Sequence, residues 1–263
     1  MTISPARTIV TVAPGSATIL QLSITNEEGA PMQVVPVILG ARQDEKGRPI
    51  FEKQSDVAEG WTVADQNSID VAAGQTKKIV FTITVPARTG PGSHYLGVGI
   101  EPVVKSGGTV SLGTRLLSLV TMYVAGPATE KINLVNWSPD HSLTSAPSWP
   151  FRLEMKNEGT VDVSTQARFN VKGWNGKTLF SQEFSTGNKI LPESTRQLYP
   201  VVEVGDEGWF WPGRYQVEAV VDYGATGQEV RATQTIWYVP WSAVGAVCIV
   251  IGAVGFVVWR LKR

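Results

Sequence analysis

The sequence predicts an all-β protein: two tandem immunoglobulin-like β-sandwiches followed by one C-terminal transmembrane α-helix. Three observations predict this arrangement. Short runs in which apolar and polar residues alternate recur along most of the chain. The 26 glycines and 16 prolines are scattered between these runs, as expected of many turns. The residues from Val239 to Trp259 form one continuous uncharged run.

The first domain is predicted over residues 1–126. Its alternating runs are RTIVTVAP, ATILQLSITN, MQVVPVIL, KKIVFTITVP, HYLGVGIEPV and TRLLSLVTMYVA. Such alternation places one set of side chains in a core and the other in water. The segments NEEG, DEKGRP and GPG supply the Asn, Gly and Pro that tight turns require.

The second domain is predicted over residues 127–237, because the same layout recurs there. An alternating run, an Asn-Glu turn with Gly and a second alternating run occur in both halves, as ATILQLSITNEEGAPMQVVPVIL and as SWPFRLEMKNEGTVDVSTQARFNV. Each half later has a Pro-Gly pair just before a strand that carries Tyr95 or Tyr215. We expect both tyrosines to bury their rings, with the hydroxyl bonded to backbone. The repeat indicates a duplicated sandwich.

The tail predicts a membrane span over residues 238–260 and a short basic cytoplasmic end over 261–263. About 20 apolar residues cross the hydrocarbon core as a helix. Aromatic and basic side chains at both ends are the expected interface anchors: Trp237, Tyr238, Trp241, Trp259, Arg260, Lys262 and Arg263. The basic end predicts a single-pass protein of the cell membrane with its N-terminal domains extracellular and its C-terminus cytoplasmic.

That orientation requires an export signal, and MTISPARTIV lacks the apolar core of one, so we expect the signal to have been cleaved or to be missing. A tail-anchored cytosolic protein is the alternative.

Composition argues against several classes of function. The formal net charge is zero, with 23 basic and 23 acidic residues, so we expect no nucleic-acid partner. His94 and His141 are the two histidines and Cys248 is the single cysteine, and they do not form a metal-ligand pattern. No set of nucleophile, base and orienting group emerges. We therefore expect no enzyme activity, no cofactor and no metal.

Two groups of residues are candidate contacts for a ligand or partner. Trp209, Phe210 and Trp211 are consecutive, so they cannot all face one core, and an exposed ring could stack on a sugar or anchor a protein. Burial against the neighbouring domain or the membrane surface is the interpretation we favour for these three residues, and the contact is the second one. His94, beside Tyr95, could point outward to a polar ligand.

Several stretches carry a resemblance to a known family. ISPARTIVTVAPGSATILQLSITN, AGQTKKIVFTITVP and GPGSHYLGVGIEPV resemble the N-terminal peptidoglycan-binding domain of the WxL-interacting proteins of Gram-positive surfaces. EMKNEG, ILPESTRQL and WPGRYQVEAVVDYG resemble the host-binding domain of the same family, in which a C-terminal transmembrane helix follows. The resemblance implies a membrane-anchored surface protein that contacts peptidoglycan and another surface protein.

The opening stretch also resembles the first domain of pilus chaperones, through Pro5, Arg7 and Gly15. The alternative function is therefore a membrane-tethered assembly or secretion accessory protein that acts by strand addition. A long uncharged sheet edge in the first domain favours this alternative, whereas an aromatic-lined groove favours wall binding. An enzyme with an unrecognised site is a third hypothesis, marked by a pocket of convergent polar groups.

Overall fold

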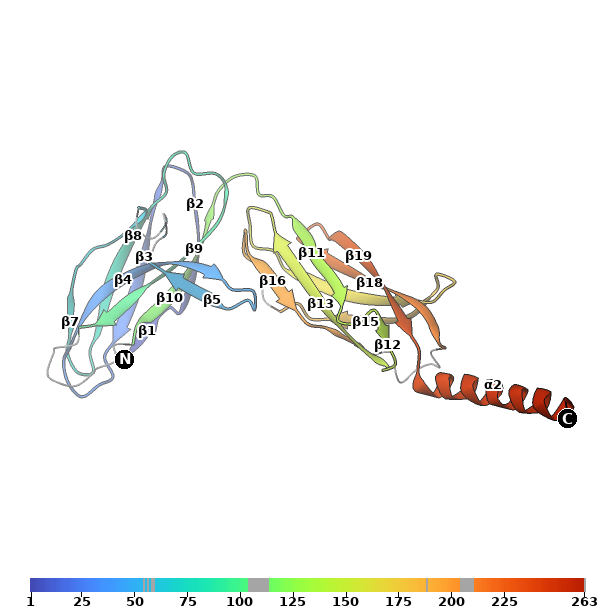
Figure 1. Cartoon of the computed structure of the whole chain (residues 1–263). Coiled ribbons are helices and arrows are strands. Elements are labelled where there is room, and N and C mark those ends of the chain that lie inside the picture. The colour runs from blue at the N-terminus through green and yellow to red at the C-terminus, as the bar shows by residue number, and fades with distance from the viewer. Residues whose placement is uncertain are drawn as a thin grey trace. The chain divides into compact units, whose positions relative to one another are not determined.

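The computed structural model describes residues 1–53, 55, 57, 60–103, 114–187, 189–203 and 211–262, without the side chains at positions 242, 243 and 246. These residues form two compact units (Figure 1). Unit 1 comprises Met1–Lys131, Asn157–Asp162 and Leu191–Ser194; unit 2 comprises Ile132–Lys156, Val163–Ile190 and Thr195–Arg263. Strands make up most of both units, so the prediction of an all-β protein is confirmed.

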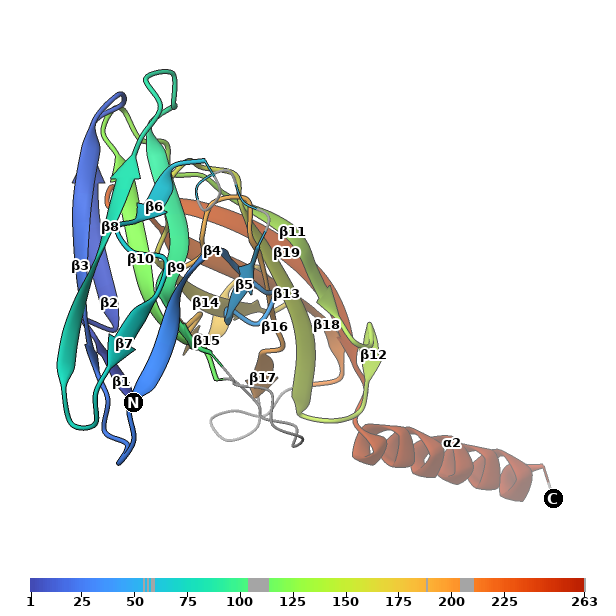
Figure 2. The same ribbon diagram turned by 90° about the vertical axis from the view of Figure 1, so that its left-hand side faces the viewer.

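Unit 1 is a sandwich of two sheets. The first sheet, which can be followed in Figure 2, is antiparallel in the order β1 (Thr2–Ser4), β3 (Ala17–Thr25), β8 (Thr76–Thr84), β6 (Thr62–Ala64). The second sheet, called here the large sheet of unit 1, has the order β2 (Arg7–Val12), β10 (Leu116–Val124), β9 (Gly92–Pro102), β4 (Met32–Gln43), β5 (Pro49–Glu52), with β7 (Ile69–Val71) also paired to β4. The chain passes from the first sheet to the second between Ser4 and Arg7.

Unit 2 repeats the two-sheet plan. Its small sheet contains β11 (Ile132–Pro139), β13 (Ser148–Asn157) and β16 (Thr195–Leu198), with β17 (Val201–Glu203) also paired to β13. Its large sheet has the order β12 (Leu143–Thr144), β19 (Gln228–Tyr238), β18 (Gly213–Tyr223), β14 (Thr165–Lys172), β15 (Thr178–Phe184). In both large sheets the last strand pairs in parallel with a strand from early in its own half, β10 with β2 and β19 with β12.

Each unit has its own core, built from the inward side chains of alternating strands. In unit 1, Leu20, Leu22 and Ile24 are buried, whereas Ile19 on the opposite face of β3 is 69% exposed. In unit 2, the Trp137 ring stacks between Phe151 and Phe169, with ring centroids 4.1 Å and 5.0 Å away. The Trp137 indole N–H donates to the Val217 carbonyl at 3.1 Å, which satisfies its buried polar group.

The Asn-Glu turn predicted in both halves has the same geometry in both. Asn26 Nδ2 donates to the Ala30 and Val71 carbonyls at 2.8 Å and 3.0 Å, and Asn26 Oδ1 accepts from Glu28 N at 3.0 Å. Asn157 Nδ2 donates to the Val161 carbonyl at 2.8 Å, and its Oδ1 accepts from Gly159 N at 2.9 Å. Both asparagines are fully buried, and the side chain of each satisfies backbone groups of its turn by hydrogen bonds.

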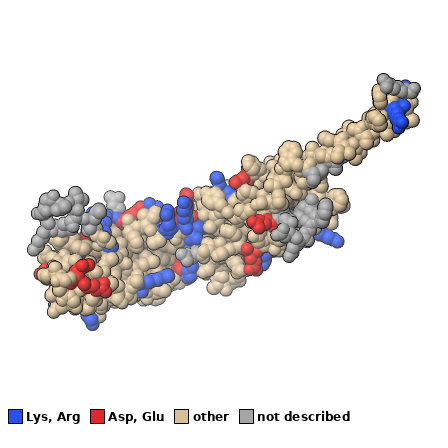
Figure 3. Space-filling view, turned by 90° about the horizontal axis from the view of Figure 1, so that it is seen from below, with Lys and Arg blue, Asp and Glu red and all other residues tan. Residues whose placement is uncertain are grey.

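The C-terminal helix is α2 (Trp241–Leu261), and its described surface is uncharged until Arg260 in the last turn (Figure 3). Within the part of the chain described above, no helix combines the length and the apolarity that crossing a membrane demands. The prediction of a membrane span over residues 238–260 is therefore corrected. The single-pass topology, with extracellular N-terminal domains and a cytoplasmic end at 261–263, rested on that span and is corrected with it.

Candidate functional site

An edge of the large sheet of unit 1 leaves backbone groups unpaired. β2 is the terminal strand of this sheet, and its register with β10 runs from Arg7–Leu119 to Val12–Val124. The Leu119 amide donates to the Ala6 carbonyl at 3.0 Å, and the Ala125 amide to the Val12 carbonyl at 2.9 Å. Because backbone groups alternate in direction along a parallel ladder, those of Arg7, Ile9 and Thr11 point to the open side.

The start of β10 extends the same edge. Leu116, Leu117 and Ser118 pair with β9 on one side, but the register with β2 begins only at Leu119. In the described residues their other side therefore has no strand partner. We call the combination of β2 with the start of β10 the open edge.

The open edge is almost free of charge. β10 has no charged residue from Leu116 to Val124, and Arg7 is the one charged residue of β2. Charges and prolines within an edge strand normally discourage pairing with another chain. The open edge lacks these protections over Thr8–Val12 and Leu116–Ser118, so it can accept another strand.

The outward face of the large sheet, behind the open edge, is apolar around Gly97 and Gly99, with Arg7 and Glu101 at its borders, opposite Leu119 and Val35. Gly97 and Gly99 of β9 lie opposite Leu119 and Leu117 of β10 on one side and opposite Leu39 and Val37 of β4 on the other. Figure 1 shows these central strands side by side. We call the following residues the apolar face: Ile9, Val35, Val37, Leu39, Phe51, Gly97, Gly99, Leu117 and Leu119.

The two glycines are required by close packing on this face. A Cβ added at Gly97 would lie 2.6 Å from the Phe51 ring, and one at Gly99 would lie 1.8 Å from the Leu116 carbonyl oxygen. Ile9 is 58% exposed, and Leu117, Leu119 and Phe51 are half-buried. The apolar face can therefore receive apolar side chains from a segment paired at the open edge.

A polar cluster closes one end of this face, within unit 1. Asp162 Oδ1 accepts hydrogen bonds from Ser93 Oγ at 3.1 Å and from the Tyr123 hydroxyl at 2.9 Å. The Thr160 carbonyl accepts from Ser93 N at 2.8 Å. Burial, and then the neighbouring Asp162 carboxylate, raise the pKa of Tyr95, which stays a neutral phenol. These contacts fix the 157–162 turn to β9 and β10.

The sequence-predicted contact residues do not gather into one site. His94 lies on the opposite side of β9 from the apolar face, with its ring 5.0 Å from that of Trp61, and burial lowers its pKa. Tyr95 lies beside the polar cluster. Trp211 is 76% exposed and its carbonyl accepts the Tyr215 hydroxyl at 2.7 Å. Trp209 and Phe210 fall outside the described residues.

The predicted interface anchors lie at the end of unit 2 and along α2. Trp237, Trp241 and Trp259 are 51%, 77% and 50% exposed, whereas Tyr238 is buried in the core of unit 2. Arg260 and Lys262 follow on the helix, and Arg263 lies outside the described residues. With the membrane span corrected, these residues have no assigned role as anchors.

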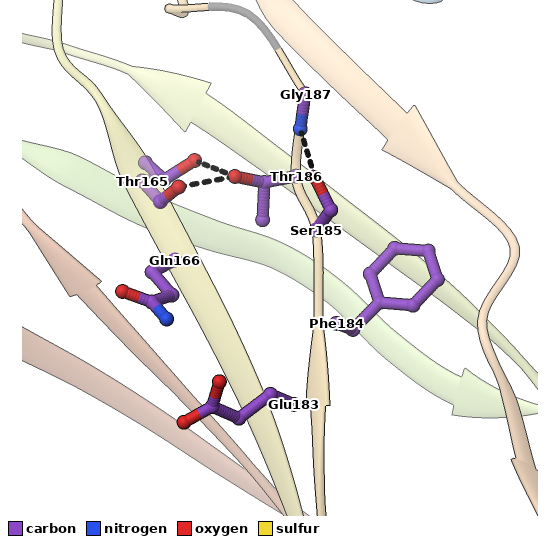
Figure 4. Close-up of a pocket in the computed structure, with 7 residues that line it drawn as sticks. All are labelled: Thr165, Gln166, Glu183, Phe184, Ser185, Thr186 and Gly187. Carbon is purple, nitrogen blue, oxygen red and sulfur yellow. Dashed lines mark hydrogen bonds between the residues drawn. The ribbon is translucent and has the colours of Figure 1, made fainter.

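A polar cavity of about 330 Å³ lies in unit 2 (Figure 4), lined by Thr165, Gln166, Glu183, Phe184, Ser185, Thr186 and Gly187. Its wall groups bond to one another: Thr165 Oγ1 lies 2.8 Å from Thr186 Oγ1, and Gly187 N donates to Ser185 Oγ at 3.4 Å. Glu183 is the one ionisable residue in this lining, so the cavity has no pair of acid and base. In the described part of the chain, no three His, Cys, Asp or Glu side chains gather to hold a metal.

Sequence comparison finds no family model and no curated protein that matches the chain. Solved structures do match. A chain from work titled "Chaperone-tip adhesin complex is vital for synergistic activation of CFA/I fimbriae biogenesis" has a TM-score of 0.51 and 12% identity, over 91% of this chain and 98% of that chain.

Two further matches have lower TM-scores. The class 5 fimbriae chaperone CfaA has a TM-score of 0.46 and 13% identity, over 91% and 99% of the two chains. The E. coli chaperone DraB has 0.41 and 17%, over 88% and 96%. At these identities the likeness shows the fold alone, and it extends over both units.

These findings correct the main functional prediction. A membrane-anchored surface protein that binds peptidoglycan is wrong, because no membrane-crossing helix is found in the described residues and the fold is that of a chain from a chaperone–tip adhesin complex. The alternative prediction, an assembly accessory protein of the pilus-chaperone kind, agrees better with the fold. The resemblance to WxL-interacting proteins is not tested by these comparisons and stays a prediction.

Proposed function

We propose that this protein is a non-enzymatic assembly chaperone of the pilus-chaperone kind, which binds an extended segment of a partner protein at the open edge. The observation that carries the proposal is the long uncharged edge of β2 and β10 in front of the apolar face. A long uncharged edge in the first domain is the feature by which the sequence distinguishes strand addition from binding to the cell wall. The fold shared with a chain from a chaperone–tip adhesin complex supports it.

Strand addition would work through two kinds of contact. Backbone hydrogen bonds to the outward groups of Arg7, Ile9 and Thr11 would supply affinity that does not depend on the partner's sequence. Alternate apolar side chains of the partner would contact the apolar face and select for a period of two. A partner with an incomplete sheet, such as a fimbrial subunit, has the exposed apolar strand edge that this arrangement would protect.

The test uses a synthetic peptide of alternating Thr and Val as the probe. Hydrogen exchange followed by NMR should show that the peptide slows exchange at the Leu117 amide and changes it at the amides of Ile9 and Thr11. Exchange along β19 of unit 2, which β12 covers at two positions only, should stay unchanged. A peptide with Pro at alternate positions should have no effect, because Pro has no N–H to donate.

A matched pair of variants tests the apolar face. Leu119→Lys should weaken binding of the Thr-Val peptide by about tenfold or more, because a charge would replace an apolar side chain beside Gly97 and directly opposite Arg7. Ile19→Lys replaces a 69% exposed residue of the other sheet and should bind like the original protein. Equal binding by the two variants, or protection of β19 with no change at the open edge, would contradict the proposed function.

A further inference from the structure

β2 is weakly anchored for a strand that covers an uncharged neighbour. Of its six residues only Val12 is buried, at 4% exposure, whereas Ile9 is 58% exposed and Arg7 and Thr11 are also exposed. It contacts the sheet through one parallel ladder, a pairing slightly less stable per residue than the antiparallel one. The Thr8 hydroxyl is buried without a hydrogen-bond partner, which lowers the stability of this strand further.

β10, in contrast to β2, is firmly held in the sheet. It pairs with β9 over all nine of its residues, and Ser118, Val120, Thr121, Met122 and Val124 are buried. A strand so apolar and uncharged is typical of the interior of a sheet and is prone to pair with other chains when left uncovered. β10 therefore needs a neighbour on its second side, and β2 is the neighbour it has in this structure.

In unit 2 the strand that corresponds to β2 is much shorter. There β12 pairs with β19 at two positions only, Leu143 with Trp237 and Thr144 with Tyr238. The remainder of β19 carries Glu229 and Arg231 and is largely exposed, so it tolerates an open side. The longer cover in unit 1 thus follows the need of β10 and not the shared two-sheet plan.

We propose that β2 is an exchangeable strand: it covers β10 in the free protein, and the extended segment of the partner displaces it and pairs with β10 directly. This inference rests on the proposed function and specifies how the open edge binds. Displacement of β2 would speed hydrogen exchange at the amides of Ile9 and Thr11, whereas addition of a strand outside β2 would slow it. The incoming segment should resemble β2 in its chemistry, with apolar side chains two residues apart in the places of Val10 and Val12. It should lack charges between them, because Val12 is buried beside the core.

A disulfide can lock β2 in place. Ile9 and Thr121 are direct cross-strand partners on the outward face, so cysteines there are close enough to be bridged. The Thr121 hydroxyl has no hydrogen-bond partner, so its replacement breaks no hydrogen bond. The locked protein is Ile9→Cys with Thr121→Cys in a Cys248→Ser background, because Cys248 is exposed and would form unwanted disulfides.

The probe is a fluorescent peptide with the sequence of residues 6–13, ARTIVTVA, which β10 already accepts as part of its own chain. The reduced protein should bind the peptide, and the oxidised protein should bind at least about tenfold more weakly. A control disulfide, Thr25→Cys with Thr76→Cys, joins two threonines of the other sheet whose hydroxyls are 2.9 Å apart. Its oxidation should leave binding unchanged.

Two results would overturn the exchange. Equal binding by the oxidised and the reduced forms of the Ile9→Cys, Thr121→Cys variant would mean that a strand adds outside β2. The proposed strand addition at the open edge would then still stand. Absence of binding by the reduced protein would also exclude exchange. In that case the hydrogen-exchange experiment with the Thr-Val peptide decides separately whether the proposed function survives.

Discussion

The large sheets of the two units have the same strand plan, but their outward faces differ in chemistry. In unit 1 that face is apolar, with Gly97 and Gly99 at its centre. In unit 2, counted from the glycine that begins each strand, the same places on β18 are Glu218 and Val220. Ion pairs surround them: Lys172 with Glu218 at 2.7 Å, Arg168 with Glu229 at 3.2 Å, Arg168 with Asp222 at 3.6 Å, and Arg231 with Glu229.

The difference shows how one plan can serve two purposes. A face covered with paired charges stays in water and resists association, whereas an apolar face beside an open edge can take up a partner. The proposed binding therefore concerns the large sheet of unit 1, and we expect the large sheet of unit 2 to contribute mainly stability. Four predictions test this division, from the largest expected effect to the smallest.

The largest effect should come from replacing Gly99 of β9 by valine, the residue that occupies the matching place on β18 of unit 2. Gly99→Val should destabilise unit 1 by about 3 kcal/mol, because even a Cβ there would lie 1.8 Å from the Leu116 carbonyl oxygen and β9 would separate from β10. Urea unfolding followed by circular dichroism measures the loss. Val220→Ala in unit 2 is the comparison and should cost less. A stable Gly99→Val protein would show that β9 and β10 can separate at little cost.

The two buried turn asparagines, one from each half of the repeated layout, should have equal importance for stability. Asn26→Ala and Asn157→Ala should each cost about 2 kcal/mol, because each leaves buried backbone carbonyls and an amide without their partners. The same unfolding experiment applies. A difference between the two variants as large as the effect itself would mean that the two turns are not equivalent.

The two tyrosines should differ. Tyr215→Phe should cost about 1 kcal/mol, because it removes the hydrogen bond to the Trp211 carbonyl. Tyr95→Phe should instead cost little or no stability, because the Tyr95 hydroxyl is buried without a hydrogen-bond partner and its removal breaks no hydrogen bond. A loss in urea unfolding as large as that of Tyr215→Phe would refute this difference.

The smallest effect concerns pH and belongs to unit 2. The Lys172 ammonium, hydrogen-bonded to Glu218, holds the pKa of that carboxyl below its usual value. The stabilisation is present above the unfolded-state pKa, about 4.3, and is lost as the pH falls through the lower folded-state value. It should amount to less than about 1 kcal/mol. Glu218→Gln should flatten this part of the pH profile of urea unfolding, whereas a change at neutral pH alone would point to another group.

The sequence by itself determined the all-β character, the repeated layout and the turns. These features depend on neighbours along the chain: alternation decides which side chains of β3 are buried, and Asn26 and Asn157 each donate to a backbone carbonyl four residues later. The alternative function also followed from the sequence. The membrane prediction rested on the composition of the tail, and the structure did not support it.

Only the tertiary structure decided which residues form the site, because these depend on register and on contacts between distant segments. Tyr95 lies three residues after Gly92 and Tyr215 two after Gly213, and since side chains of a strand alternate, Tyr215 enters the core while Tyr95 faces outward. Asp162 reaches Ser93 from 69 residues away. The apolar face combines four strands in addition to β2, and no local pattern brings Gly97, Phe51 and Leu119 together.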